Sequence, residues 1–239
     1  FTEAGVQEDV FVARVDGTQY RRLTDDAFRD RGPAWAPDGA RIAFYSDRSG
    51  GYEAWMIRPD GSGLTQVTSG TGSAGFPAWS PDGKTFAFGF DKWYLVDPGA
   101  PSKTTPPVES AISPTERFLP ASWSSTGGRI AGQVLGPDGW LNSLGVYSVP
   151  TKQFTRVPGE LARAPGWLFP VWMGDSRRVL VRRPDGVAIV NADTGAGRLL
   201  VVVGGDMIGH TVGVSRDNRW ITYTETATEG DIWIATIRQ

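Results

Sequence analysis

The stretch Pro33-Ala34-Trp35-Ala36-Pro37-Asp38-Gly39 decides the fold, because it recurs along the chain. It returns almost unchanged as Pro77-Ala78-Trp79-Ser80-Pro81-Asp82-Gly83. Looser copies are Ser122–Gly127, Pro170–Ser176 and Val214–Asn218, where Val214 replaces the tryptophan. The anchors of the five copies stand at positions 35, 79, 123, 172 and 214, with spacings of 44, 44, 49 and 42 residues.

Each copy opens the same order of predicted strands. After the turn comes an apolar–polar alternation such as Arg41-Ile42-Ala43-Phe44, whose period of two marks a strand. A third strand, such as Ala54–Ile57, and a fourth, such as Thr65–Thr68, follow. The anchor spacing agrees with the roughly 40–45 residues of a four-stranded propeller blade. We therefore predict an all-β fold, a six-bladed β-propeller of four-stranded antiparallel blades.

The two ends of the chain bear on the number of blades. Phe1 and Phe11 are separated by the same 10 residues as Tyr223 and Trp233, so the first residues align with the last repeat. We expect one propeller domain over residues 1–239, whose first and last blades are incomplete. Exposed strand edges invite aggregation, so we expect residues upstream of Phe1 to complete the first blade. A seven-bladed parent, or a five-bladed ring with the first pair of strands displaced, is the alternative. The predicted blades are 1–24, 31–68, 75–107, 118–158, 168–202 and 209–239.

The composition excludes several functional classes. The chain has 24 basic and 26 acidic residues and a net charge of −2, whereas nucleic-acid binders usually carry a basic excess. No apolar run approaches the roughly 18 residues of a membrane helix. Cysteine is absent and His210 is the single histidine, so thiolate chemistry and multi-histidine metal sites are ruled out. We expect no cofactor, no metal, no nucleic-acid partner and no membrane span, and we expect a monomer.

The repeat resembles a known family. The turn Trp79–Gly83, the strand Ile42–Phe44, the loop Ser46–Glu53 and the turn Asp60–Gly63 together resemble the TolB-like, WD40-like β-propeller repeat. This resemblance covers essentially the whole chain and implies a periplasmic or extracellular protein with a central channel. Relatives include TolB itself, the propeller domains of prolyl-oligopeptidase-like peptidases, and some polysaccharide lyases.

The tryptophans fall into two groups. Those at the repeated positions 35, 79, 123 and 172, and at 55, 93 and 233, are predicted to fill the wedges between neighbouring blades. Trp140 and Trp167 lie off this register, in loops, and are candidates for a ligand platform, with simple loop packing as the alternative.

The repeated aspartates are given a structural interpretation. Asp38, Asp82 and Asp217 share the anchor turn, where we expect each carboxylate to cap its own backbone and not to bind a metal. The loop Asp47–Glu53 carries oxygen ligands, but it lacks the spacing of an EF-hand calcium loop.

No catalytic set is recognisable in the sequence. A Gly-x-Ser-x-Gly elbow is absent, and His210 is either a general base at the mouth of the channel or a loop histidine bonded to backbone. We therefore favour a non-catalytic extracytoplasmic binding or scaffold protein that recognises a protein, peptide or saccharide. The alternative is the substrate-filtering propeller domain of a prolyl-oligopeptidase-like peptidase, or a propeller lyase.

Binding is expected where the loops between fourth and first strands meet the loops between second and third strands, since these share one face of a propeller. That face mixes charged and aromatic side chains, which suits a polar ligand or peptide. The candidate ligand- or partner-binding residues there are Asp30, Arg31, Asp47, Arg48, Arg117, Phe118, Trp167, Arg182, His210 and Glu225.

Overall fold

The computed structural model describes most of the chain, and all regular secondary structure in the described part is β. For Leu141, 207–211, 223–226 and 231–236 the backbone alone is described. Contacts divide the chain into two compact units, Phe1–Val108 and Glu109–Gln239, which are taken separately below. No helix in the described part is long and apolar enough to cross a membrane. The described residues are 8–14, 16–72, 75–89, 92–100, 108, 115–136, 141–202, 207–215, 217–226 and 231–236.

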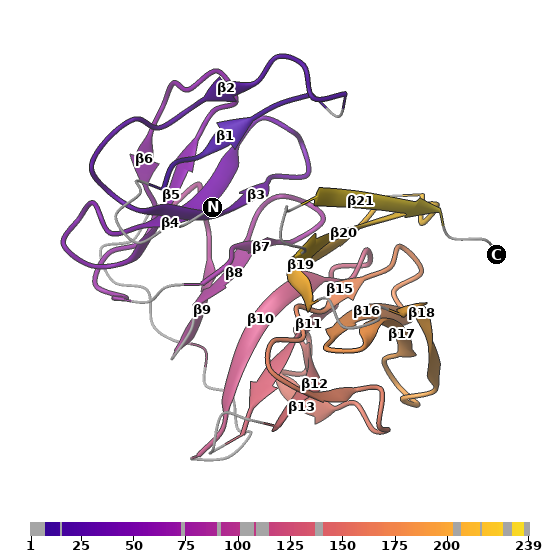
Figure 1. Ribbon diagram of the computed structural model, residues 1–239. Coiled ribbons are helices and arrows are strands. Elements are labelled where there is room, and N and C mark those ends of the chain that lie inside the picture. Colours follow the sequence, from indigo (N-terminus) through magenta and orange to yellow (C-terminus); the bar gives the residue numbers. More distant parts are fainter. Residues whose placement is uncertain are drawn as a thin grey trace. The chain divides into compact units, whose positions relative to one another are not determined.

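The first unit contains three antiparallel sheets in its described residues (Figure 1). Consecutive strands are neighbours in each sheet, so every sheet is a simple meander. The strands of the first sheet are β1 (Phe11–Val12) and β2 (Arg21–Arg22). Those of the second are β3 (Asp30–Trp35), β4 (Ile42–Ser46), β5 (Glu53–Ile57) and β6 (Thr65–Gln66). Those of the third are β7 (Ala78–Trp79), β8 (Phe86–Gly89) and β9 (Trp93–Val96).

The second unit repeats the meander in three further sheets among its described residues. The first has β10 (Arg117–Trp123), β11 (Arg129–Leu135), β12 (Leu141–Ser148) and β13 (Gln153–Arg156). A short strand, β14 (Arg163–Pro165), also pairs with β12, which the sequence pattern did not predict. The next sheet has β15 (Val171–Trp172), β16 (Arg178–Arg183), β17 (Gly186–Asn191) and β18 (Gly197–Val202). The last has β19 (Met207–Val214), β20 (Trp220–Thr226) and β21 (Asp231–Thr236).

The same hydrogen-bonded turn closes the first hairpin of five sheets. In the first copy, the N–H of Ala36 donates to the carbonyl of Arg41 (2.8 Å) and the N–H of Gly39 donates to that of Ala36 (2.9 Å). The other four copies have the same pair of bonds, with first donors Ser80, Ser124, Met173 and Ser215. The fourth residue of each turn has a positive φ, at Gly39, Gly83, Gly127, Ser176 and Asn218. The repeat read from the sequence is therefore a repeat of backbone geometry.

Two of the repeated tryptophans pack one sheet against the preceding one. Trp79 is buried in a cluster with Ala54 and Met56 of the second sheet, and its Nε1 donates to the carbonyl of Ala34 (3.1 Å). The guanidinium of Arg41, from that same sheet, lies 5.4 Å from the Trp79 ring centroid. The predicted packing between sheets is confirmed for this tryptophan.

Trp172 has the equivalent position in the second unit. It is buried with Leu144 and Val146 of the preceding sheet, and the guanidinium of Arg129 lies 4.7 Å from its ring centroid. Trp55 likewise packs against the core cluster that contains Val10, the residue before β1.

The packing prediction does not hold equally at every repeated position. Trp35 is 50% exposed, because β1 and β2 are the only described strands of the sheet before it. Trp123 is partly buried, and the side chain of Trp233 lies outside the described residues.

Candidate functional site

The predicted site residues Asp30 and Arg48 form a buried ion pair at the loop end of the second sheet. Asp30 begins β3, and Arg48 follows β4. Nη2 of Arg48 donates to both oxygens of Asp30 (2.7 and 2.6 Å), Nη1 lies 3.0 Å from Oδ2 of Asp26, and Nε donates to Oγ of Ser46 (3.0 Å). The Arg48 side chain is almost fully buried. These contacts hold the loop that contains Asp26 and the loop that contains Arg48 against the sheet.

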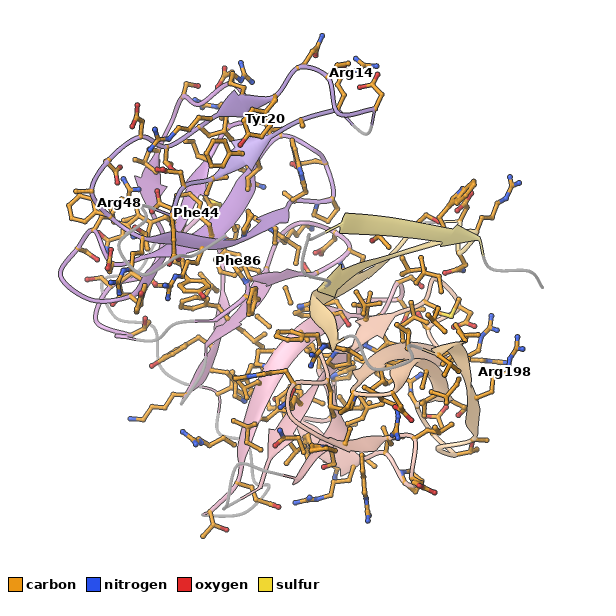
Figure 2. All side chains as sticks on the ribbon, viewed as in Figure 1. Arg14, Tyr20, Phe44, Arg48, Phe86 and Arg198 are labelled. Atoms are coloured by element: carbon orange, nitrogen blue, oxygen red, sulfur yellow. The ribbon has the colours of Figure 1, made fainter. Side chains whose placement is uncertain are left out.

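Three aromatic rings lie near the same guanidinium. Figure 2 labels Arg48 and one of these rings, Phe44. The centroids of Phe44 and Trp55 lie 5.9 and 5.1 Å from its central carbon, and that of Phe28 lies at 5.7 Å. Phe44 and Trp55 belong to the sheet, whereas Phe28 is an exposed loop residue. Asp47 supports the same loop, since its Oδ1 accepts a hydrogen bond from the N–H of Arg29 (2.9 Å). Arg48 is thus a fixed cation against which the exposed Phe28 ring packs.

Arg31 belongs to a second group on the same sheet. Its guanidinium pairs with the carboxylate of Glu8 and donates to the Tyr52 hydroxyl (3.2 Å). The hydrogen bond to Glu8 raises the pKa of Arg31 further above its ordinary value, although burial acts in the opposite direction. Arg31 is therefore a fixed cation that remains partly exposed.

Three aromatic rings continue this group. The Tyr45 ring makes edge contacts with Tyr52 and Phe76, at centroid distances of 5.5 and 6.0 Å. Gly32 lies against these rings, and a Cβ there would come within 2.7 Å of Phe76 and 2.8 Å of Tyr45. Burial raises the pKa of Tyr45. We call Phe28, Arg31, Tyr45, Tyr52 and Phe76 the aromatic–arginine surface.

A buried carboxylate holds the loop that leads to Phe76. Glu53 accepts hydrogen bonds from Oγ1 of Thr68 (2.6 Å), from N and Oγ1 of Thr71 (2.8 and 2.7 Å) and from N of Gly72 (3.1 Å). The sequence interpretation missed this role of Glu53. A signal was present, because Asp9 and Thr24, which flank the strands of the first sheet, form the same carboxylate–threonine pair at the same separation of 15 residues.

In the second unit, the predicted site residue Trp167 lies in a loop fixed by buried side chains. The carbonyl of Trp167 accepts a hydrogen bond from Nη1 of Arg182 (2.8 Å). The N–H of Leu168 donates to Oε1 of Gln133 (2.7 Å), and the carbonyl of Leu168 accepts from the N–H of Arg182 (2.8 Å). Burial lowers the pKa of Arg182. Two strands, β11 and β16, thereby position this loop.

The Trp167 ring itself stacks on a neighbour. Its centroid is 5.7 Å from that of Phe169, with 23° between the ring planes. Trp167 is 37% exposed. We call Trp167 and Phe169 the aromatic ledge.

The remaining predicted residues are placed less favourably for binding. Phe118 is buried in β10, with its ring 5.2 Å from that of Phe154, so it belongs to the core. Arg117 is exposed at the start of β10. His210, expected in a loop, lies within β19, because that stretch pairs with β20. Glu225 lies in β20 opposite Ile208. The side chains of His210 and Glu225, and all of Trp140, lie outside the described residues.

The anchor-turn aspartates cap their own turns, as predicted. Oδ1 of Asp38, Asp82 and Asp217 accepts the N–H two residues on, at 2.9, 3.1 and 3.1 Å. The hydroxyl of Ser80 lowers the pKa of Asp82, and that of Ser215 lowers the pKa of Asp217. In the described part of the chain, no three or more His, Cys, Asp or Glu side chains lie close enough to hold a metal ion.

Antiparallel meanders of three or more described strands, each with the same repeated turn at its anchor, are the repeats of a β-propeller fold. Residues 1–92 match the family described as the TolB beta propeller domain, so this part of the chain carries TolB-like repeats. No curated protein matches the sequence.

Solved structures extend the likeness in fold to nearly the whole chain. TolB from Acinetobacter baumannii is similar with a TM-score of 0.72 at 18% identity, over 95% of this chain and 56% of that one. An oligogalacturonate lyase in complex with manganese gives a TM-score of 0.68 at 16% identity, over 97% of this chain and 72% of the lyase. A structure from a study of two prolyl endopeptidases gives 0.61 at 16% identity, over 97% of this chain and 38% of that one. At these identities the likeness concerns the fold, and this chain spans about half the length of the first protein.

Proposed function

We propose that this protein is a non-catalytic binding or scaffold protein that recognises a protein, peptide or saccharide at the loop ends of its sheets. The aromatic–arginine surface carries the proposal. Phe28 and Phe76 are exposed, yet one rests on the buried Arg48 and the other on Tyr45. Aromatic residues and arginine dominate the energetically important centres of interfaces. Rings that are already fixed lose little side-chain freedom on binding.

We propose that residues 1–239 form one propeller domain. The six described sheets are its six blades, and the first and last blades are incomplete. The constant anchor turn and the TM-score of 0.72 over 95% of this chain support this arrangement. The protein acts as a monomer, and its likeness to TolB supports a periplasmic or extracellular location.

Site-specific photocrosslinking tests the binding function. A photoreactive residue at position 28 or 76 is expected to capture a cell-envelope partner, whereas one at position 64 is not. Leu64 is a matched control, since its exposure of 40% is close to the 42% of Phe76 and it lies in the turn before β6, away from these loops.

The captured partner is then purified and titrated by calorimetry. Phe76→Ala and Phe28→Ala are each expected to weaken its binding about tenfold, which corresponds to about 1.4 kcal/mol. Leu64→Ala should leave the affinity unchanged. Failure to capture any partner, or equal losses in all three variants, would contradict the proposal.

The structural likenesses support a second candidate function. In the study of prolyl endopeptidases this chain corresponds to 38% of the protein, which suits a substrate-filtering domain of a larger peptidase. The complete reading frame would then encode an adjoining hydrolase domain. The likeness to a manganese-bound lyase supports a propeller lyase, in which His210→Ala would abolish cleavage of an oligogalacturonate.

A further inference from the structure

A pocket lies between the first and second sheets of the first unit. Its volume is about 470 Å³, within the range of about 300–1,000 Å³ that is typical of ligand pockets. The hairpin of β1 and β2 forms most of its lining, and Pro59, in the turn between β5 and β6, contributes from the second sheet. A guanidinium N–H of Arg21 donates to the carbonyl of Pro59, so a hydrogen bond joins the two sheets at this point. The pocket shares no residue with the aromatic–arginine surface.

One wall of the pocket is an aromatic ring that the hairpin holds in place. Tyr20 is 68% exposed, and its ring stacks on that of Phe11, with 5.1 Å between the centroids and 15° between the ring planes. Gln19 also lines the pocket and has a φ of 53°, in a region that residues other than glycine adopt rarely. Backbone strain of this kind is concentrated at ligand-binding positions. An exposed ring that is already positioned loses little freedom when a ligand packs on it.

The charged side chains that line the pocket are two arginines, Arg14 and Arg21, and both are exposed. Figure 2 shows Arg14 near the tip of the hairpin. Its Nε lies 3.7 Å from Oδ2 of Asp16, and an exposed ion pair at this distance holds an arginine only weakly. The hydrogen bond that Arg21 makes with Pro59 goes to a neutral carbonyl, which leaves the positive charge of Arg21 uncompensated by that contact.

Two carboxylates near these arginines are bonded to their own turns. Oδ1 of Asp16 accepts hydrogen bonds from the N–H and the hydroxyl of Thr18 (3.0 and 2.6 Å). Oδ1 of Asp60, which lies near Arg21, accepts the same two bonds from Ser62 (2.9 and 2.6 Å). Neither carboxylate lines the pocket. The lining is therefore positively charged, and it is complementary to an anionic ligand.

We propose that this pocket binds an acidic peptide segment of a partner protein, in which an apolar side chain packs on Tyr20 and flanking carboxylates pair with Arg14 and Arg21. Guanidinium groups bind carboxylates through charge-assisted hydrogen bonds. Val12 and Pro59 give the pocket an apolar part, against which the hydroxyls of a sugar would lack hydrogen-bond partners. The chemistry of the lining thus favours a peptide with a mixture of acidic and apolar side chains. This inference goes beyond the proposed function, because it concerns a separate surface.

Calorimetric titration of the full chain tests the inference. The probe is the capped peptide Glu-Glu-Phe-Glu-Glu, and the comparison probes are the same peptide with a central Ala, the basic peptide Lys-Lys-Phe-Lys-Lys, and trigalacturonate as an anionic sugar. We expect the first peptide to bind most tightly. Its affinity should fall as the salt concentration rises from about 50 mM to about 300 mM, because salt screens exposed charges.

Variants of the lining separate the ring from the charges. Tyr20→Ala should weaken binding of the acidic peptide about tenfold, and Tyr20→Phe should restore most of the affinity, since the ring makes the contact. The double variant Arg14→Gln with Arg21→Gln should also weaken it about tenfold and remove most of the salt dependence.

Two control variants should bind the acidic peptide as the unchanged protein does. Arg198→Gln removes an exposed arginine from β18, in the other unit. Phe28→Ala removes an exposed ring from the aromatic–arginine surface, with an exposure of 41%. Circular dichroism and the melting temperature will establish that each variant is folded.

Four results would overturn the inference: the acidic peptide does not bind, the basic peptide binds as tightly, Tyr20→Ala leaves the affinity unchanged, or trigalacturonate alone binds in a way that depends on the two arginines. The proposed function fails separately, through Phe28 and Phe76. If the crosslinked partner binds normally while the acidic peptide does not bind, the assignment of this pocket alone is wrong.

Discussion

Arg48 shows how a charged loop residue can become part of the buried framework of its sheet. Its guanidinium is shared between Asp30 and Asp26, and the Phe28 ring lies over it. Loss of one partner from a buried ion pair is costly, because the other charge then lacks compensation. Under the proposed function, the contribution of Arg48 would be indirect, through the loop and the ring that it positions.

Arg48→Met is expected to lower the free energy of unfolding by about 3–5 kcal/mol, because it leaves the buried Asp30 carboxylate uncompensated. Urea denaturation followed by circular dichroism measures the loss. Arg14→Met is the control, since the Arg14–Asp16 pair is exposed and should contribute about 0–1 kcal/mol. Equal losses in the two variants would contradict a structural role for Arg48.

Gly32→Ala tests the packing beneath Phe76. The φ of Gly32 is 60° and a Cβ would meet the Phe76 and Tyr45 rings, so we expect a loss of stability above the roughly 1 kcal/mol of backbone strain alone. Gly39→Ala isolates the strain, because φ there is 69° and a Cβ meets nothing within 4 Å. Chemical denaturation of both variants gives the difference. Identical losses of stability in the two variants would show that the Phe76 and Tyr45 rings move aside without cost.

Between elements, the repeated tryptophans join one sheet to the next, and their burial differs. Trp172 is 5% exposed, whereas Trp35 at the equivalent position is 50% exposed. Trp172→Ala is expected to cost about 3–5 kcal/mol through the cavity it leaves. Trp35→Ala should cost clearly less, and thermal or urea unfolding compares the two. A larger loss at Trp35 would mean that its ring is covered in solution.

The anchor turns should make stability sensitive to acid. The pKa of Asp82 is lowered in the folded chain, so the folded state binds fewer protons than the unfolded state as the pH falls. The stabilisation is complete above the ordinary value of 3.8 and is lost as the pH falls through the lower folded value. Asp82→Ala should therefore make the melting temperature less dependent on pH between about pH 5 and about pH 2. Parallel profiles for the variant and the unchanged protein would exclude this contribution.

For the molecule as a whole, periodic features were the ones that sequence alone could predict. The anchor turns, the order of strands and the turn-capping aspartates recur, so each copy supports the interpretation of the others. Strand β14 lies outside the repeat, and a three-residue stretch ending in Pro165 gave no signal above that of a loop.

The candidate site was predictable only in part, for a physical reason. Trp167 stood out because it is off the repeat register, and the structure places it exposed in its loop. Asp30 and Arg48 were predicted as charges of a binding surface, but they form a buried ion pair with each other although 18 residues separate them in the sequence. Gln133 and Asn142 act only through tertiary contacts with the Gly166–Leu168 backbone, which no local pattern encodes.

The arginine–tryptophan contacts between sheets have a consequence for recombination. Arg41 belongs to one repeat and the ring that it stacks on, Trp79, opens the next, and Arg129 and Trp172 are divided in the same way. A graft cut at the tryptophan would separate each cation from its ring. The segment that keeps each arginine with its ring therefore runs from the arginine to the next anchor tryptophan, and it does not coincide with the sequence repeat. Chimaeras of such proteins should tolerate junctions placed before the arginine better than junctions placed at the tryptophan.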